Sequence, residues 1–317
     1  MITWVLGGAV LVVAAFVLLS PLESLRWWAD KGQAEIAATF EQLPTEGLRP
    51  SESTAFVVYL SGVGVLGGDA LSDRERAWLD AVGERVPSAE IVSDVFPYAV
   101  DNRGLLQRAT MGLWKLLDWT RRHWHWNPVH NLINVRNIAQ VLVSADPRYG
   151  PTFNIGLAQE IWRALQRHGY RPGSGAPVTL MGLSGGAQMA LGAGWFLHAL
   201  QVPVSMISIG GIFGDDPGLD RMRHVWHLTG TADHAHLLGT IAFPGRWPTA
   251  PMSPWGRAKR EGRVSFHTIG PMGHDGTNGY YGRRAVDAEG RSHFELTRDA
   301  VVEILTTECG RFSTQGA

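Results

Sequence analysis

The sequence predicts an α/β protein whose core is a mostly parallel, twisted sheet with helices on both faces. Short apolar runs, such as residues 55–60, 177–183 and 204–209, alternate along the chain with longer helix-compatible stretches. Strands that alternate with helices form parallel βαβ units, and strands that are apolar along their length are covered on both sides. The 317 residues are enough for one large α/β domain with a well-buried core.

The expected elements follow one another in a regular order. They are a strand over residues 55–60, a helix over 72–86, a strand over 90–98, a helix over 156–168, a strand over 177–183, a helix over 185–200, strands over 204–209, 224–228 and 264–269, and a closing helix over 294–306. Ser72 or Asp73 is the expected N-cap of the first helix.

The N-terminal segment has a different character. Residues 2–19 contain no charged side chain and are long enough to cross a bilayer core. No basic side chain precedes the run, and the residues after it do not resemble a cleavage site, so an uncleaved anchor is favoured over a signal peptide. We therefore expect a single-pass membrane protein with a transmembrane anchor over 1–20, a juxtamembrane helix and linker over 21–53, and a domain over 54–317. Arg26 and Lys31 follow the run, which favours a cytoplasmic domain, although two charges leave the side of the membrane open.

Charge and cysteine content narrow the classes of function. The chain has 28 basic and 29 acidic side chains, with a net charge of −1 and no long basic block. This balance argues against a nucleic-acid partner. Cys309 is the one cysteine, so no disulfide can form within the chain.

A Gly-x-Ser-x-Gly motif follows the strand expected over 177–183. The residues Gly182-Leu183-Ser184-Gly185-Gly186 have the form of a nucleophile elbow, in which a serine stands on a tight strand-to-helix turn. Side chains two positions before and after the serine would meet neighbouring backbone, which explains the glycines. For the motif alone, the alternative is a glycine-rich turn with a spectator serine, since the chain has 38 glycines.

Later strands supply candidates for an acid and a base. A nucleophilic serine needs a base, the base needs an acid that orients it, and sites in such sheets form beyond the carboxyl ends of the strands. Asp233 and His274 each follow a strand, and the order Ser184, Asp233, His274 predicts a catalytic triad. Three alternatives remain open. Asp233 could be a helix N-cap, and Asp215 or Asp216 could be the acid instead. The base could be His234, His236 or His267, although none of these follows a glycine at the end of a strand, as His274 does.

At these positions the chain resembles the α/β-hydrolase superfamily, over about residues 55–306. The resemblance rests on the segments Leu60-Ser61-Gly62-Val63-Gly64, Gly182-Leu183-Ser184-Gly185-Gly186, Gly230-Thr231-Ala232-Asp233 and Gly273-His274. It implies an α/β-hydrolase fold in which Ser184 is the nucleophile, His274 the general base and then acid, and Asp233 the orienting acid. It also implies an oxyanion site formed by the Gly185 N–H and by the N–H of Val63 or Gly62. Many members carry His-Gly where this chain has Ser61-Gly62, a change that keeps a backbone donor.

A tryptophan-rich insertion is expected over about residues 101–149. Leucines and tryptophans alternate there with basic side chains, which predicts an amphipathic cap over the sheet edge or a lid that touches the membrane surface. His123, His125 and His130 lie within it, and their tryptophan neighbours favour an interface over a metal site.

These observations predict a membrane-anchored serine hydrolase of the esterase or lipase type. Its substrate would be a small-molecule or lipid acyl ester, and neither a metal nor an organic cofactor is expected. Two alternatives remain: a thioesterase or peptidase with the same triad, and a non-catalytic membrane-anchored scaffold with the same fold. The sequence predicts no oligomeric state.

Overall fold

A six-stranded parallel sheet forms the centre of the molecule. The computed structural model describes residues 53–63, 71–97 and 128–315, with side chains given from residue 137 to 308 in the last range. The strands lie in the order β2-β1-β3-β4-β5-β6. Their bounds are Ala55–Leu60 for β1, Ala89–Val92 for β2, Val178–Leu183 for β3, Val204–Ile209 for β4, Val225–Thr229 for β5 and Val264–Thr268 for β6. All five neighbouring pairs are parallel, which confirms the expected sheet.

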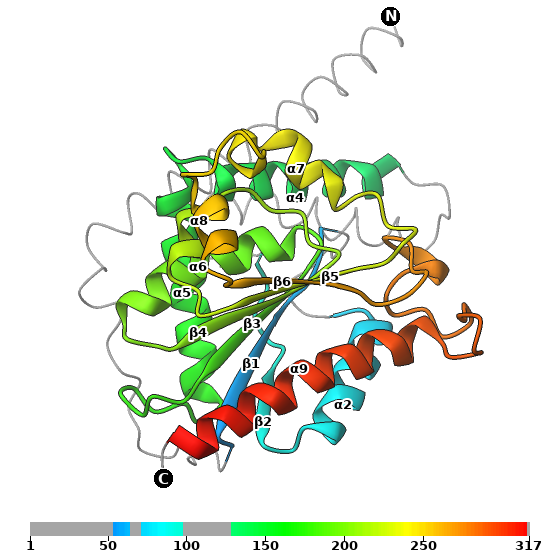
Figure 1. Ribbon diagram of the computed structural model, residues 1–317, viewed down its shortest axis with the longest axis horizontal. Helices are drawn as coiled ribbons and strands as arrows, with labels where there is room; N and C mark the ends of the chain where they lie inside the picture. Colours follow the sequence, from blue (N-terminus) through cyan, green and yellow to red (C-terminus); the bar gives the residue numbers. More distant parts are fainter. Residues whose placement is uncertain (1–52, 64–70, 98–127, 316–317) are drawn as a thin grey trace, which may run out of the picture.

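Helices cover both faces of this sheet (Figure 1). On one face lie α2 (Asp73–Arg85) and α9 (His293–Gln315), and on the other lie α5 (Gly150–Arg167) and α6 (Gly186–Ala199) with α4 (Pro128–Ala145) beside them. Successive strand side chains point to opposite faces. Val58, Leu180 and Met206 therefore pack under α5 and α6, whereas Met181 and Ile207 belong to the core under α2 and α9.

Shorter elements lie between the ends of the later strands. They are η1 (Pro217–Asp220), α7 (Leu237–Ala242), η2 (Pro244–Arg246), α8 (Pro254–Arg260) and η3 (Gly276–Asn278). Elements of three to seven residues are too short to show a helical period, so the sequence predicts none of them by pattern. The open reading of Asp233 as a helix N-cap is wrong, since the N-cap of α7 is His236.

Several expected bounds were wrong. The strand expected over 90–98 ends at Val92, after which Asp94 forms an ion pair with Arg167 at the end of α5, with 2.8 Å between the nitrogen and the oxygen. The helix expected from residue 156 begins at Gly150, since Pro151 fits a first helical turn. The closing helix runs to Gln315 rather than 306, so Cys309 lies within it.

The expected insertion over 101–149 is described only in part. Its second half contains α4, and residues 98–127 lie outside the described ranges. The predicted anchor over 1–20 and nearly all of the linker over 21–53 also lie outside them. Within the described residues, no helix is both long enough and apolar enough to span a bilayer.

A polar contact joins α4, α5 and α6 behind the sheet. The Asn154 side chain of α5 accepts a hydrogen bond from the Ser144 hydroxyl at 2.7 Å and donates one to the Ser144 carbonyl at 3.1 Å. Gly192 of α6 faces this amide, and a Cβ at Gly192 would lie 2.2 Å from the Asn154 nitrogen. The absence of a side chain at Gly192 thus lets α6 approach a fixed polar group.

Gly192→Ala is expected to lower the free energy of unfolding by about 2 kcal/mol, because the new methyl group would break a buried pair of hydrogen bonds. Gly194→Ala is the matched control. Its Cβ would lie 2.2 Å from the terminal methyl of Met222, a flexible side chain that can move away. Replacing a helical glycine by alanine contributes about 1 kcal/mol of stability in both variants, so the difference between them reports the contact with Asn154. Urea unfolding measures the free energy of unfolding of both variants. An equal decrease in Gly192→Ala and Gly194→Ala would contradict the importance of the contact with Asn154.

Candidate active site

Ser184 occupies a strained turn between β3 and α6. Its φ is +52°, in the left-handed region that disfavours side chains by about 1–2 kcal/mol. Backbone hydrogen bonds hold this conformation: the Ser184 N–H donates to the Ile209 carbonyl at 3.0 Å, and the Ser184 carbonyl accepts from Ala187 at 3.1 Å and Ile212 at 3.0 Å. The end of β4 therefore fixes the turn that presents the serine.

The glycines around Ser184 stand where neighbouring backbone leaves no room. A Cβ at Gly182 would lie 2.5 Å from the Ala187 nitrogen, and one at Gly186 would lie 2.3 Å from the Leu60 carbonyl oxygen. Any side chain at either place would push α6 away from β3 or β1. This close approach is the one that the sequence pattern predicts for a nucleophile elbow.

Ser184, His274 and Asp233 form a continuous hydrogen-bonded chain. The Ser184 Oγ lies 2.8 Å from His274 Nε2, and His274 Nδ1 lies 3.1 and 3.0 Å from the two carboxylate oxygens of Asp233. A carboxylate can only accept, so Nδ1 carries the proton and Nε2 accepts from the serine hydroxyl. The structure thus brings together the three side chains predicted from the sequence.

Asp233 is buried, at 1% exposure, yet it favours the ionised form. Burial opposes ionisation, but hydrogen bonds from His274, from the Tyr280 hydroxyl at 2.6 Å and from the Ala235 N–H at 2.9 Å outweigh it. Together they lower the pKa of Asp233 from 3.8 to about 2. The carboxylate therefore stays negative beside the imidazole at neutral pH.

The loop after β1 lies against the serine. A Cβ at Gly62 would lie 3.3 Å from the Ser184 Cβ, so the backbone of this loop passes directly beside the serine. The Asn137 side chain of α4 donates a hydrogen bond to the Val63 carbonyl at 2.6 Å and fixes the loop. Gly185 is the N-cap of α6, and N–H groups at the start of a helix have no partner within it. Backbone of Gly62 and Gly185 therefore borders Ser184, and Val63 follows Gly62 in the same loop.

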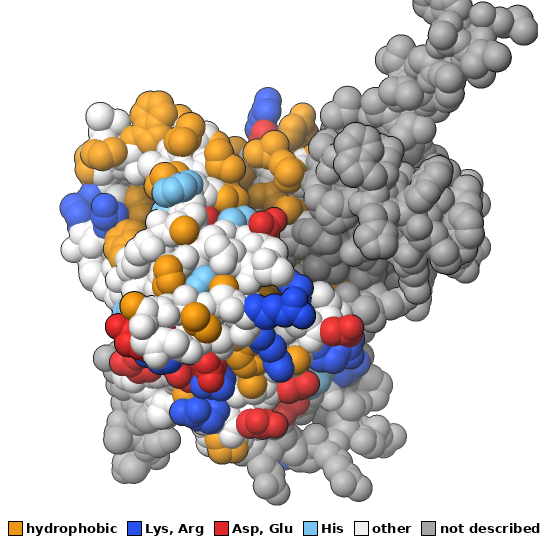
Figure 2. Space-filling model, turned by 90° about the vertical axis from the view of Figure 1, so that its right-hand side faces the viewer, with side chains coloured by type: hydrophobic (Ala, Val, Ile, Leu, Met, Phe, Trp, Pro, Cys, Tyr) orange, Lys and Arg blue, Asp and Glu red, His pale blue; other side chains and the backbone are white. Residues whose placement is uncertain are grey.

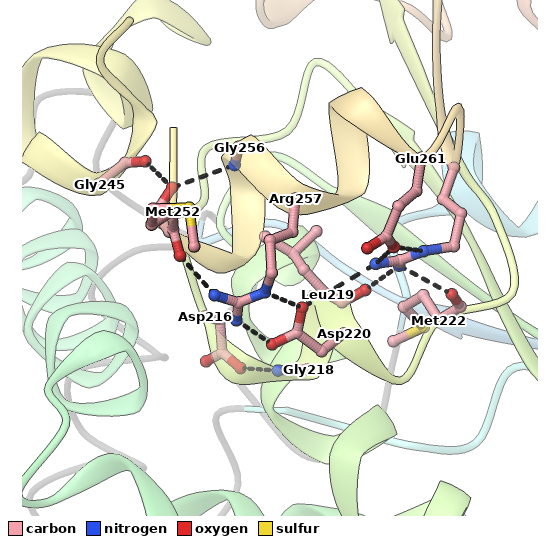
Figure 3. A network of polar contacts seen from close by, with 12 residues as sticks. Asp216, Gly218, Leu219, Asp220, Met222, Gly245, Met252, Gly256, Arg257 and Glu261 are labelled. Atoms are coloured by element: carbon pink, nitrogen blue, oxygen red, sulfur yellow. Dashed lines mark hydrogen bonds and ion pairs between the residues drawn. The ribbon is translucent and has the colours of Figure 1, made fainter. Parts of the chain in front are cut away.

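The rival acids lie elsewhere. Asp216 caps η1 by accepting from the Gly218 N–H at 2.7 Å (Figure 3) and also accepts from the Gln188 amide at 2.9 Å. Burial raises its pKa from 3.8 to about 6, against these hydrogen bonds. Asp215 lies against Gly245. It is Asp233 that contacts His274.

Among the described residues, Ser184 forms its side-chain hydrogen bond with His274 and with none of the rival histidines. His234 and His267 are exposed, and the His236 ring lies 5.8 Å from the ring of His227. His123 and His125 lie outside the described residues, and of His130 only the backbone is described. Within the described part of the chain, no group of three His, Cys, Asp or Glu side chains could hold a metal ion.

Two residues at the site were missed by the sequence prediction. Tyr280 contacts Asp233 from 47 residues away in the chain, and Asn137 contacts Val63 from 74 residues away. Neither belongs to a motif. A signal for Tyr280 was its position soon after Gly273-His274 in a short loop, whereas nothing in the sequence marks Asn137.

Comparisons with known proteins add only distant likenesses. No family model matches the chain, and no curated protein matches it. Among solved structures, a dienelactone hydrolase from Anabaena variabilis is 13% identical with a TM-score of 0.37, covering 80% of this chain and 86% of its own. A dienelactone hydrolase-like promiscuous phosphotriesterase from metagenomic libraries is 14% identical with a TM-score of 0.40, covering 82% and 87%. At this distance the likenesses do not bear on activity, so the chemistry is argued from the chain's own geometry.

The low pKa of Asp233 predicts a stability change in acid. The carboxyl titrates at about 2 in the folded protein and at 3.8 in the reference state. The unfolded chain therefore binds more protons in this window, and the contribution of Asp233 to stability is lost as the pH falls from about 4 to about 2. The difference in unfolding free energy between the wild type and Asp233→Asn should shrink by about 2 kcal/mol over that range. A difference that stays constant in urea unfolding at pH 4, 3 and 2 would contradict the low pKa.

Proposed function

We propose that this protein is a serine hydrolase that cleaves an acyl ester through an acyl-enzyme on Ser184. The observation that carries the proposal is the strained Ser184, whose Oγ lies 2.8 Å from His274 Nε2 while His274 Nδ1 contacts a buried, ionised Asp233. A serine hydroxyl becomes a nucleophile when a base accepts its proton and an acid holds the base in the right tautomer.

The first half of the reaction is acyl transfer. Ser184 Oγ attacks the ester carbonyl while its proton moves to His274 Nε2, and Asp233 stabilises the imidazolium that forms. The negative charge that develops on the carbonyl oxygen would be stabilised by the Gly185 N–H and by the N–H of Gly62 or Val63. His274 then gives its proton to the departing alcohol oxygen, which leaves the acyl group on Ser184.

The second half of the reaction is hydrolysis. His274 takes a proton from a water molecule, which attacks the acyl carbonyl, and the same backbone donors stabilise the second oxyanion. The proton returns from His274 to Ser184 Oγ as the carboxylic acid leaves. Since every step uses side chains and backbone of this chain, the cycle requires no metal or organic cofactor.

Exposed apolar side chains on the segment that follows Asp233 support an apolar acyl substrate. Leu237, Leu238 and Ile241 of α7 are exposed, Ile241 at 69%, and Trp247 after η2 is exposed beside them. Figure 2 shows hydrophobic side chains gathered in the upper part of the molecule, at the level of α7 and α4 in Figure 1, with most acidic and basic ones below. A thioester or a peptide remains an alternative substrate, because the same triad serves acyl transfer from sulfur or nitrogen.

A non-catalytic scaffold is the second candidate function. It would need neither a serine at a φ of +52° nor a buried carboxylate aligned on a histidine. Such strain and alignment cost stability and persist where they serve a function. This cost favours the enzyme over the scaffold.

Labelling with a fluorophosphonate probe tests the enzyme directly. The wild type should be labelled on Ser184, and Ser184→Ala should not be labelled, because the probe reacts with activated serines. The proposal would be contradicted if the wild type is not labelled, or if Ser184→Ala is labelled to the same extent. A panel of esters, thioesters and amides with varied acyl length would then separate the substrate classes.

The acid is tested by two matched variants in the same assay. Asp233→Asn should lower kcat by about a thousandfold or more, because the imidazole loses the partner that fixes its tautomer. Asp216→Asn should stay within about tenfold of the wild type, since Asp216 caps η1 and does not contact His274. The reverse result would move the role of the acid to Asp216.

We further propose that residues 1–20 anchor the protein in a membrane and keep the site close to lipid. Removing these residues should move the protein from the membrane fraction to the soluble fraction, because the rest of the chain would lack the apolar run of residues 2–19. Leu11→Arg together with Ala15→Arg is the matched control, since charges in the middle of the run should release the full-length chain as well. A full-length wild type that is found in the soluble fraction would contradict the anchor.

A further inference from the structure

We propose that Tyr280 is a positioning residue for the catalytic acid, holding Asp233 in one orientation toward His274 and keeping its charge on that side. The inference rests on the proposed function and deepens it, because it assigns a role in the same site to a residue outside the triad. Tyr280 does not touch the reacting atoms and acts through Asp233.

The direction of the Tyr280 hydrogen bond is fixed by its two partners. The Tyr280 hydroxyl accepts from the Gly230 N–H at 3.1 Å and lies 2.6 Å from Asp233 Oδ2. An N–H can only donate and a carboxylate can only accept, so the phenol proton points at Asp233. One hydroxyl thus connects Gly230, the first residue after β5, with Asp233 in the middle of the same loop.

The segment that carries His274 also carries Tyr280. It is closed by a hydrogen bond from the Gly273 N–H to the Asn278 carbonyl at 2.9 Å. It is tied to α9 because the Thr297 hydroxyl donates to the Tyr280 carbonyl at 2.8 Å. The base and the residue that holds the acid therefore stand on one anchored segment, so a shift of one would move the other.

Packing leaves the carboxylate little freedom. Tyr280 is buried at 1% exposure, and Gly210, with a φ of +52°, lies directly beside it. A Cβ at Gly210 would lie 2.5 Å from the Tyr280 ring and 2.7 Å from Asp233 Oδ2. The phenol and the carboxylate thus pack directly against the backbone of Gly210. Tyr280 fills the space into which the Asp233 side chain could otherwise rotate.

The ionised form of Asp233 is stabilised mainly by hydrogen-bond donors, as the charged and titratable groups around it show. His274 faces it from the loop after β6, Tyr280 from the same loop, and His227 from β5. Burial lowers the pKa of His227 from 6.5 to about 3, so this ring is neutral and supplies no positive charge. Among the described residues, no lysine or arginine forms an ion pair with Asp233. The anion therefore depends on His274, Tyr280 and the Ala235 N–H.

Tyr281 provides a matched control. It is also buried, but its hydroxyl lies 3.1 Å from the Tyr59 hydroxyl, which in turn donates to Glu75 at 2.8 Å. Its ring packs on Trp78 with the ring centroids 4.7 Å apart. Replacing either tyrosine by phenylalanine removes one buried hydroxyl from the same loop, and only the change at Tyr280 removes a donor to Asp233.

Loss of the Tyr280 hydroxyl should raise the apparent pKa of the Asp233–His274 pair. The hydroxyl stabilises the deprotonated Asp233–His274 pair, in which the carboxylate is negative and the imidazole is neutral, more than the protonated pair. In Tyr280→Phe the pair should therefore bind its proton at higher pH, with the apparent pKa raised by about half a unit to one unit. The acid limb of the profile of kcat/KM against pH should move upward by the same amount, because the base works only when deprotonated.

The experiment compares the wild type, Tyr280→Phe and Tyr281→Phe by two readouts. Nitrogen-15 NMR of the His274 ring, assigned by its loss in His274→Gln, follows the pair without requiring any activity. Rates of fluorophosphonate labelling against pH, followed by ester hydrolysis, give the catalytic profile. We expect Tyr280→Phe to raise the apparent pKa and lower kcat about tenfold with KM within about twofold. Tyr281→Phe should leave the apparent pKa within about 0.2 unit of the wild type.

The outcomes separate the two proposals. A titration of His274 that is unchanged in Tyr280→Phe, or shifted equally in Tyr281→Phe, overturns the role of Tyr280. If the wild type is not labelled but the NMR titration shifts as expected, the serine hydrolase proposal is overturned. The role of Tyr280 in positioning Asp233 is then still supported. A fall in kcat with no change in the pH profile would mean a merely structural role and would also overturn the inference.

Discussion

The site depends on one backbone constraint, the left-handed conformation of Ser184 at the crossing from β3 to α6. With a φ of +52° the serine stands outside both elements, and the backbone hydrogen bonds to Ile209 and Ile212 hold it there. The same turn brings Gly186 so close to the Leu60 carbonyl that a Cβ would lie 2.3 Å away. The nucleophile, the first turn of α6 and the end of β1 are therefore positioned together.

A second constraint is the burial of a negative charge. Asp233 is almost completely removed from solvent, and burial by itself raises the pKa of its carboxyl. Three hydrogen-bond donors reverse this preference, and one of them is the imidazole that the carboxylate orients. The cost of burying the charge is thus offset by the contacts that align the triad. The loops that carry the acid and the base are hydrogen-bonded to each other, and the loop of the base is also tied to α9.

The sequence predicted the parts of the molecule that local pattern determines. Continuous apolar runs marked the central strands, and β4 was placed with both bounds correct because it is buried along its whole length. The spacing of Gly182, Ser184 and Gly186 marked the elbow, because steric exclusion acts within five residues. The order of Asp233 and His274 followed from their positions after successive strands.

Other features could not be predicted, because they depend on contacts between distant segments. The short helices α7 and α8 span too few residues to show a helical period, and α4 lies within the stretch that the sequence predicts as an insertion. Asn137 reaches Val63 only because α4 packs beside α6 above the end of β1. Tyr280 reaches Asp233 only because two loops meet beyond the carboxyl ends of β5 and β6. No local pattern encodes either meeting.

The central claim is that Ser184 becomes acylated during turnover. Rapid quenching of the full-length protein with an activated short-chain ester, followed by peptide mapping by mass spectrometry, measures this directly. The account predicts that the first turnovers add one acyl group to the peptide that contains Ser184, and that Ser184→Ala acquires none. Ester cleavage without an acylated intermediate, or acylation of another residue, would contradict it.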